Sequence, residues 1–148
     1  MRFLFILLFI ALSACARKNY VDPKELAQNN QQQSADCALE FTKVDLCASI
    51  SWTQGPQTPQ QSEFILHIWN KKNANVNGPY QDPTQNLSVV LWMPSMGHGS
   101  APVKIEKLQD GVFRVSNVYF IMAGDWEIRV FLKDSASTVD QATEKLVL

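Results

Sequence analysis

Two methionines and a histidine lie within six consecutive positions of the segment LWMPSMGHGS, which runs from Leu91 to Ser100. They are Met93, Met96 and His98, and the chain has only one other histidine. Thioether and imidazole groups are soft ligands that favour Cu(I) over Mg²⁺ or Ca²⁺, whereas Zn²⁺ prefers more nitrogen or thiolate. The residue types in this segment therefore indicate a copper site.

A fourth candidate ligand, Met122, lies in the segment FIMAGD. Successive hairpins reverse the strand direction, so this segment should lie at the same end of the domain as the first one. We expect His98 and Met96 to be the main ligands, with Met122 next and Met93 last. Met93 ranks last because it continues the alternation of Leu91 and should point into the core.

The same residues also have an ordinary structural interpretation. Methionine is a common core residue, and a histidine on a turn needs no ligand.

Trp92 could cover a bound cation with its ring face. His67, in FILHIWN, is expected on a strand face well away from the two segments, so we leave it out of the ligand set.

The chain opens with MRFLFILLFIALSAC, in which an apolar run is followed by small residues and Cys15. The run is too short to span a bilayer and has the length of a signal-peptide core, so residues 1–14 should be a signal peptide. The letters LSAC resemble a bacterial lipobox, whose cysteine becomes the acylated first residue of the mature protein. We therefore expect Cys15 to carry the lipid that anchors the protein to a membrane of the cell envelope, facing the periplasm or the exterior.

Two further cysteines, Cys37 and Cys47, remain once Cys15 carries the lipid. Outside the cytoplasm an even remainder is best interpreted as a disulfide, which would stabilise the fold by roughly 2.5 to 3 kcal/mol. A dithiol metal or redox site is the alternative, but the close Cys-x-x-Cys spacing is absent.

Residues 15–35 are rich in Gln and Asn and should form a disordered tether behind the anchor. Residues 36–148 are enough for one domain. Apolar residues alternate with period two in this region, for example at Leu87, Val89 and Leu91, and turn signals separate the runs. About seven to eight short strands are expected, including a first one within Leu39–Val44 and a last one within Ala142–Leu148. An antiparallel immunoglobulin-like β-sandwich is the fold that such strands favour.

Charge and motifs exclude several classes of function. The whole chain has a formal net charge of −1, and removal of Arg2 with the signal peptide makes the mature protein slightly more acidic. This leaves no basic patch for nucleic acid. There is no nucleophile motif, no phosphate-binding glycine loop and no His-Glu-x-x-His, so we do not expect an enzyme.

The segments LWMPSMGHGS and GVFRVSNVYFIMAGDWEIRVFLKD resemble the YtkA-like/FixH-like group of exported bacterial domains. The resemblance covers roughly Leu87 to Lys133. It implies an immunoglobulin-like domain linked to copper handling or to the assembly of copper-containing oxidases. Residues that match the group's two motifs are Met93, Pro94, Met96, His98 and Gly99, and then Met122, Gly124 and Trp126. FixH-type proteins have a transmembrane helix where this chain has a lipobox, a departure that weighs against an oxidase-assembly role.

Two hypotheses follow from these features. In the first, the protein is an envelope lipoprotein that binds Cu(I) and holds it or delivers it to a recipient protein. In the second, it is a structural or interaction module whose Met- and Trp-containing loops dock on another envelope protein.

Overall fold

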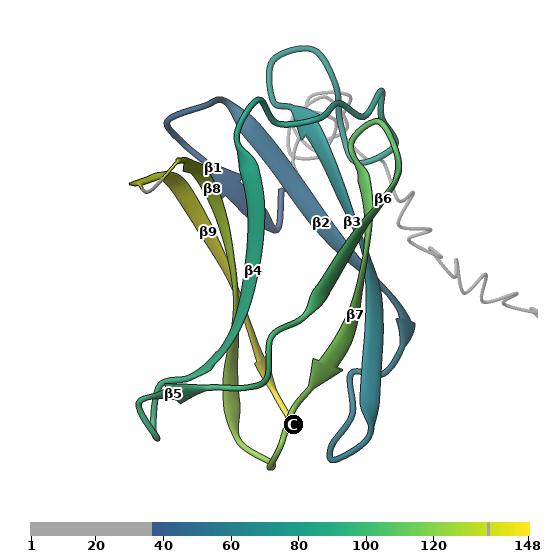
Figure 1. Cartoon of the computed structure of the whole chain (residues 1–148). Helices are drawn as coiled ribbons and strands as arrows, with labels where there is room; N and C mark the ends of the chain where they lie inside the picture. Colours follow the sequence, from purple (N-terminus) through teal and green to yellow (C-terminus); the bar gives the residue numbers. More distant parts are fainter. Residues whose placement is uncertain (1–36, 136) are drawn as a thin grey trace, which may run out of the picture.

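The computed structural model describes residues 37–135 and 137–148 (Figure 1). The expected signal peptide, the expected lipid anchor at Cys15 and the expected tether lie outside the described residues. Within them, the chain forms nine β-strands and no helix. No described segment is a helix long and apolar enough to cross a bilayer.

The strands form two antiparallel sheets that face each other (Figure 1). The five-stranded sheet has the order β1 (Leu39–Phe41), β2 (Leu46–Gln54), β3 (Gln61–Asn70), β7 (Val112–Tyr119) and β6 (Lys104–Gln109). The four-stranded sheet has the order β5 (His98–Gly99), β4 (Asn86–Met93), β8 (Asp125–Asp134) and β9 (Ser137–Val147). The expected antiparallel β-sandwich is confirmed.

Two details of the expected strand set were wrong. The structure has nine strands where seven to eight were expected, because the residues His98 and Gly99 form the short strand β5 instead of belonging wholly to a loop. The last strand, expected within Ala142–Leu148, begins at Ser137 because it pairs with β8 along its whole length. Its first residues are exposed and polar apart from Val139 and Asp140, so they lack the alternation on which the prediction relied.

Inward-facing residues from both sheets form one hydrophobic core. On the four-stranded sheet, Val89 pairs with Val130 and Leu91 with Ile128, and all four side chains are buried. At one end of the core, the rings of Phe120 and Trp126 pack edge to face with centroids 5.4 Å apart. The ends of β7 and β8 are therefore held together by a fully buried aromatic pair.

The expected disulfide is present between Cys37 and Cys47, with an S–S distance of 2.06 Å. It joins the residues just before β1 to the start of β2. β1 pairs with β2 only from Leu46 to Ala48, so the bridge reinforces a short two-strand contact. The two thiols are therefore used structurally, which removes them from the set of possible metal ligands.

Candidate functional site

The segment LWMPSMGHGS forms a tight turn between β4 and β5. β4 ends at Met93, whose carbonyl oxygen accepts hydrogen bonds from the backbone N–H groups of Met96 and Gly97 at 3.2 and 3.0 Å. Gly97 has a φ of 67°, a left-handed conformation that costs glycine nothing. The turn therefore returns the chain onto β4 within four residues.

The register of this hairpin brings two of the candidate ligands together. Met93 is the direct partner of His98 across the β4–β5 ladder. Directly opposed residues of an antiparallel pair point to the same face of the sheet, with Cβ atoms about 4.5–5.5 Å apart. The thioether of Met93 and the imidazole of His98 therefore share the inner face of the four-stranded sheet.

His98 has a ring nitrogen suited to a metal. Its Nδ1 lies 3.1 Å from the carbonyl oxygen of Gly99. A carbonyl oxygen only accepts hydrogen bonds, so Nδ1 carries a proton when this bond forms, and in the neutral ring Nε2 then has the lone pair that a metal needs. The side chain is half-buried on β5, which leaves it within reach of solvent.

The segment FIMAGD lies at the same end of the sandwich, between β7 and β8 (Figure 1). The indole Nε1 of Trp126 donates a hydrogen bond to the carbonyl oxygen of Met122 at 2.9 Å. Gly124 has a φ of 137°, and a Cβ at this position would lie 3.3 Å from Cε of Met93. The second loop therefore lies against the end of the Met93 side chain.

A serine links the two loops through hydrogen bonds. Ser100, just after β5, donates its backbone N–H to the carbonyl oxygen of Leu91 at 3.1 Å. Its hydroxyl donates to the carbonyl oxygen of Tyr119, the last residue of β7. Ser100, which follows the first loop, is therefore hydrogen-bonded to the residue at which the second loop begins.

The four predicted ligands are all at this end, with different exposures. Met93 is 1% exposed, in the core as its strand phase predicted. Met96 and Met122 are 55% and 40% exposed. The shared end and the inward position of Met93 follow the expectation, whereas residue spacing did not predict the cross-strand pairing of Met93 with His98.

Trp92 does not cover this site. It pairs with Gly99 and lies on the outer face of the sheet, where the guanidinium carbon of Arg129 is 4.8 Å from the ring centroid. Arg129 also forms an ion pair with Glu127 at 2.6 Å. The ring face expected to cover a metal is therefore occupied by a cation of the protein itself.

His67 is separate from the site, as expected. Its partner on β7 is Val112, at the opposite end of the strand from Tyr119. The imidazole packs on the ring of Tyr80 with centroids 4.9 Å apart, and burial lowers the pKa of His67 below its ordinary value. His67 is therefore an aromatic packing residue at the other end of the fold.

Sequence patterns missed the contribution of the C-terminal strand to this end. A cavity of about 470 Å³ beside the first loop is lined by Pro94, Asp125, Trp126, Glu127, Lys145, Leu146 and Val147. The last residue, Leu148, exchanges two backbone hydrogen bonds with Gly124 at 2.8 and 3.1 Å. The alternation of apolar residues at the end of β9 indicates a strand there. It does not indicate which loop that strand would contact.

The candidate ligands at this end supply sulfur and imidazole, and the carboxylates of Asp125 and Glu127 lie in the adjacent cavity. Across residues 37–135 and 137–148, no three His, Cys, Asp or Glu side chains are grouped so that they could hold a metal ion. A metal at this end would therefore depend on thioether sulfur, which suits Cu(I) and not Mg²⁺ or Ca²⁺.

Comparison with known protein families matches residues 50–131 to the YtkA-like family. The match covers more than half of the chain and includes both loops, β4 and most of β8. It begins well before Leu87, where the sequence resemblance was first apparent. Comparisons with curated proteins and with solved structures gave no match. The chain therefore belongs to the YtkA-like family.

Proposed function

We propose that this YtkA-like protein binds one Cu(I) ion between its two methionine-containing loops, and that it holds copper or delivers it to a recipient protein. The proposed ligands are His98, Met96, Met122 and Met93. The protein acts as a carrier and not as an enzyme. It is anchored to a membrane of the cell envelope through an acylated Cys15.

The observation that carries this proposal is the pairing of Met93 with His98, together with the contact of the second loop on Met93. One thioether and one imidazole are thereby placed on the same side of a rigid sheet. Met122 belongs to the loop that lies against Met93, and Met96 belongs to the turn between the two paired residues. Three sulfur atoms and one nitrogen form a donor set that fits Cu(I).

Exposure of Met96 and Met122 supports a role in transfer. Both thioethers are on the surface, so copper can reach them and a recipient protein can compete for the ion there. Met93 and His98 are already held opposite each other by the β-ladder, which limits the ordering cost of binding. Such a site would combine a fixed inner pair with an accessible outer pair.

A second candidate function is docking on an envelope protein. The same end exposes Ile121 at 48% and Val147 at 77%, in addition to Met96 and Met122. Exposed apolar residues gathered in this way are typical of interaction surfaces. Docking and copper transfer are compatible, because a recipient must contact this end.

Competition with a chromophoric Cu(I) chelator under reducing conditions tests the proposal. The wild-type protein should withdraw one equivalent of Cu(I). His98→Ala and Met96→Leu should each lower the affinity at least about tenfold, because each removes one donor while the ladder remains. Met122→Leu should have a smaller effect.

The matched control is His67→Asn, which removes the only other histidine from the opposite end of the fold. It should leave the affinity for Cu(I) unchanged. If the wild-type protein withdraws no copper, the copper proposal is wrong and docking remains as the function of this end.

A further inference from the structure

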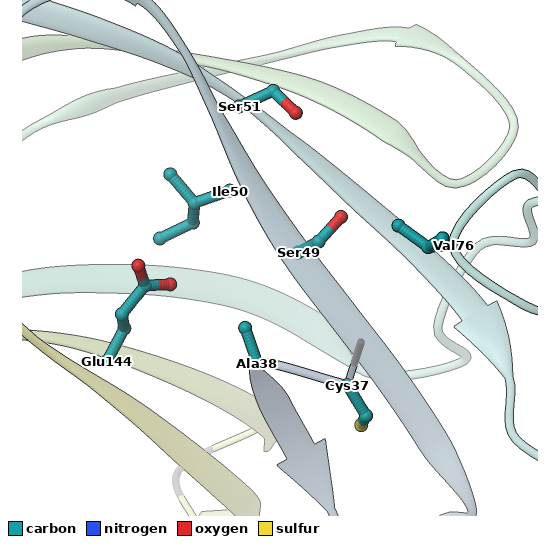
Figure 2. A pocket seen from close by; sticks show the side chains of 7 residues that line it. All are labelled: Cys37, Ala38, Ser49, Ile50, Ser51, Val76 and Glu144. Atoms are coloured by element: carbon teal, nitrogen blue, oxygen red, sulfur yellow. The ribbon is translucent and has the colours of Figure 1, made fainter. Parts of the chain in front are cut away.

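A second cavity, of about 400 Å³, opens beside the short strand β1 (Figure 2), and no residue of the methionine loops lines it. It is lined by Cys37, Ala38, Ser49, Ile50, Ser51, Val76 and Glu144. β1 covers β2 only as far as Ala48, and among the described residues no other strand pairs with this side of β2 beyond that point. The cavity is therefore located where the coverage by β1 stops, and its volume lies in the range of small-molecule sites, about 300–1,000 Å³.

Among the described residues that line this cavity, Glu144 is the one with a charged side chain. It pairs with the buried Ile128 across β8 and β9, so its side chain points between the two sheets. Figure 2 shows its carboxylate directed towards Ile50, while Ser49 and Ser51 lie on the other side of β2. The carboxylate oxygen Oε2 is buried and has no hydrogen-bond partner among the described residues.

Another inward carboxylate of the same strand shows what Glu144 lacks. Asp140 is buried and accepts hydrogen bonds from the backbone N–H groups of Lys43 and Gln141, at 2.6 and 2.8 Å. No described residue donates a hydrogen bond to Oε2 of Glu144, and burial raises the pKa of Glu144 above the ordinary value. A buried acceptor without a partner destabilises a protein, and a bound donor with a positive charge would remove that cost.

We propose that this cavity binds a small aliphatic amine. Its ammonium group donates hydrogen bonds to Glu144, and its alkyl chain packs on Ala38 and Ile50. A single carboxylate among the described lining residues favours a ligand with one buried cation.

The test uses the purified full-length protein, labelled with ¹³C and ¹⁵N and kept in a non-ionic detergent. n-Butylammonium chloride is the probe, and n-butanol is its neutral match. Butylammonium should give saturable shifts at Ala38, at residues 49–51 and at the side-chain carboxyl carbon of Glu144. Butanol at equal concentration should not.

Two further measurements connect binding to the carboxylate. Glu144→Gln, which keeps the shape and removes the charge, should weaken butylammonium binding at least about tenfold. Glu106→Gln, at an exposed position on β6, should leave it unchanged. In the wild-type protein, saturating butylammonium should lower the pKa of Glu144, read from its carboxyl carbon shift.

Three results would overturn the proposal: no saturation by butylammonium, equal shifts with butanol, or equal binding by Glu144→Gln. Shifts confined to exposed carboxylates outside the cavity would do the same. None of these results depends on copper, because the cavity contains none of the proposed copper ligands.

Discussion

Met93 has two roles at the residue scale, in the core and in the candidate site. Its side chain is almost fully buried, and its end lies under Gly124. His98, its partner across the ladder, is half-buried, and its ring Nδ1 bonds the carbonyl oxygen of its neighbour Gly99. Removing the sulfur and removing the imidazole should therefore have different consequences.

Met93→Leu should cost less than about 1.5 kcal/mol of folding free energy, because the substitution conserves volume in a packed core. It should lower the affinity for Cu(I) less than His98→Ala does, because Met93 is the least accessible of the four proposed ligands. Urea unfolding and chelator competition measure the two effects. A larger loss of copper affinity for Met93→Leu than for His98→Ala would reverse our ranking of the ligands.

The partly buried carboxyl group of Glu144 leads to a prediction about how folding stability depends on pH. Burial holds its folded-state pKa above the ordinary value of 4.5, so the folded protein binds this proton more tightly than the unfolded chain does. The resulting stability is fully present below about pH 4.5 and is lost as the pH rises through the folded-state pKa. Glu144→Gln should therefore be more stable than the wild type at pH 7 and about equal to it at pH 4.

Urea unfolding of both proteins at the two pH values, without added amine, measures this difference. The comparison cancels the titration of all other groups, provided that the substitution leaves their surroundings unchanged. A stability difference that is the same at pH 4 and pH 7 would contradict the assignment of an unpartnered carboxylate.

At the scale of elements, the strands that were predicted well are those with one buried face. β4 and β8 have apolar residues at every second position, and the expected alternation at Leu87, Val89 and Leu91 lies within the observed β4. The first half of β9 was missed because Ser137, Thr138 and Gln141 are exposed and the strand is fixed by pairing with β8. Pairing with a neighbouring strand does not require a local pattern of hydrophobic residues, so the sequence does not show it.

The candidate site was predictable to a similar extent. Alternating strand directions placed the Met96 and Met122 loops at one end of the domain, because that argument needs only the order of the strands. The Met93–His98 register depends on the length and geometry of one turn, which residue types do not determine. The stacking of Arg129 on Trp92 depends on pairing between β4 and β8, so it could not be predicted from the sequence either.

The contact between the two loops can be tested at Gly124. Gly124→Ala should cost about 1–3 kcal/mol, because φ is 137° and the new Cβ would crowd Cε of Met93 at 3.3 Å. It should also weaken Cu(I) binding by displacing the second loop from the first. Urea unfolding and chelator competition provide the measurements.

Gly97→Ala is the matched control for this substitution. Gly97 also has a positive φ, of 67°, but a Cβ there would have no heavy atom within 4 Å beyond its chain neighbours. Its cost should be smaller, because only the backbone conformation is strained. Equal losses for the two variants would show that the contact between Gly124 and Met93 contributes nothing.

At the scale of the whole molecule, the two ends of the described domain differ in their exposed side chains. At the end away from the methionine loops lie surface ion pairs, among them Lys72 with Asp45 and Lys107 with Asp82 and Asp110. At the loop end lie the exposed side chains of Met96, Ile121, Met122 and Val147. This polarity suits a domain that presents one end to a partner and keeps the other in water.

The proposed anchor makes a prediction at this scale. Cys15→Ser should abolish acylation, so the protein should no longer fractionate as a lipid-modified membrane protein. Mass spectrometry of the mature N-terminus and membrane fractionation measure this. A wild-type N-terminus at any residue other than an acylated Cys15 would contradict the anchor and leave the domain's copper chemistry untouched.

X-ray absorption spectroscopy of the Cu(I)-loaded protein tests the central claim most directly, because it identifies the atoms bonded to copper. Sulfur should dominate the bonded atoms, together with one imidazole nitrogen, and that nitrogen should disappear in His98→Ala. The other two sulfur atoms among the described residues belong to Cys37 and Cys47, which are joined in a disulfide. Any copper–sulfur bonds would therefore be assigned to Met93, Met96 and Met122. Copper bonded only to nitrogen and oxygen, or a spectrum unchanged by His98→Ala, would contradict the account.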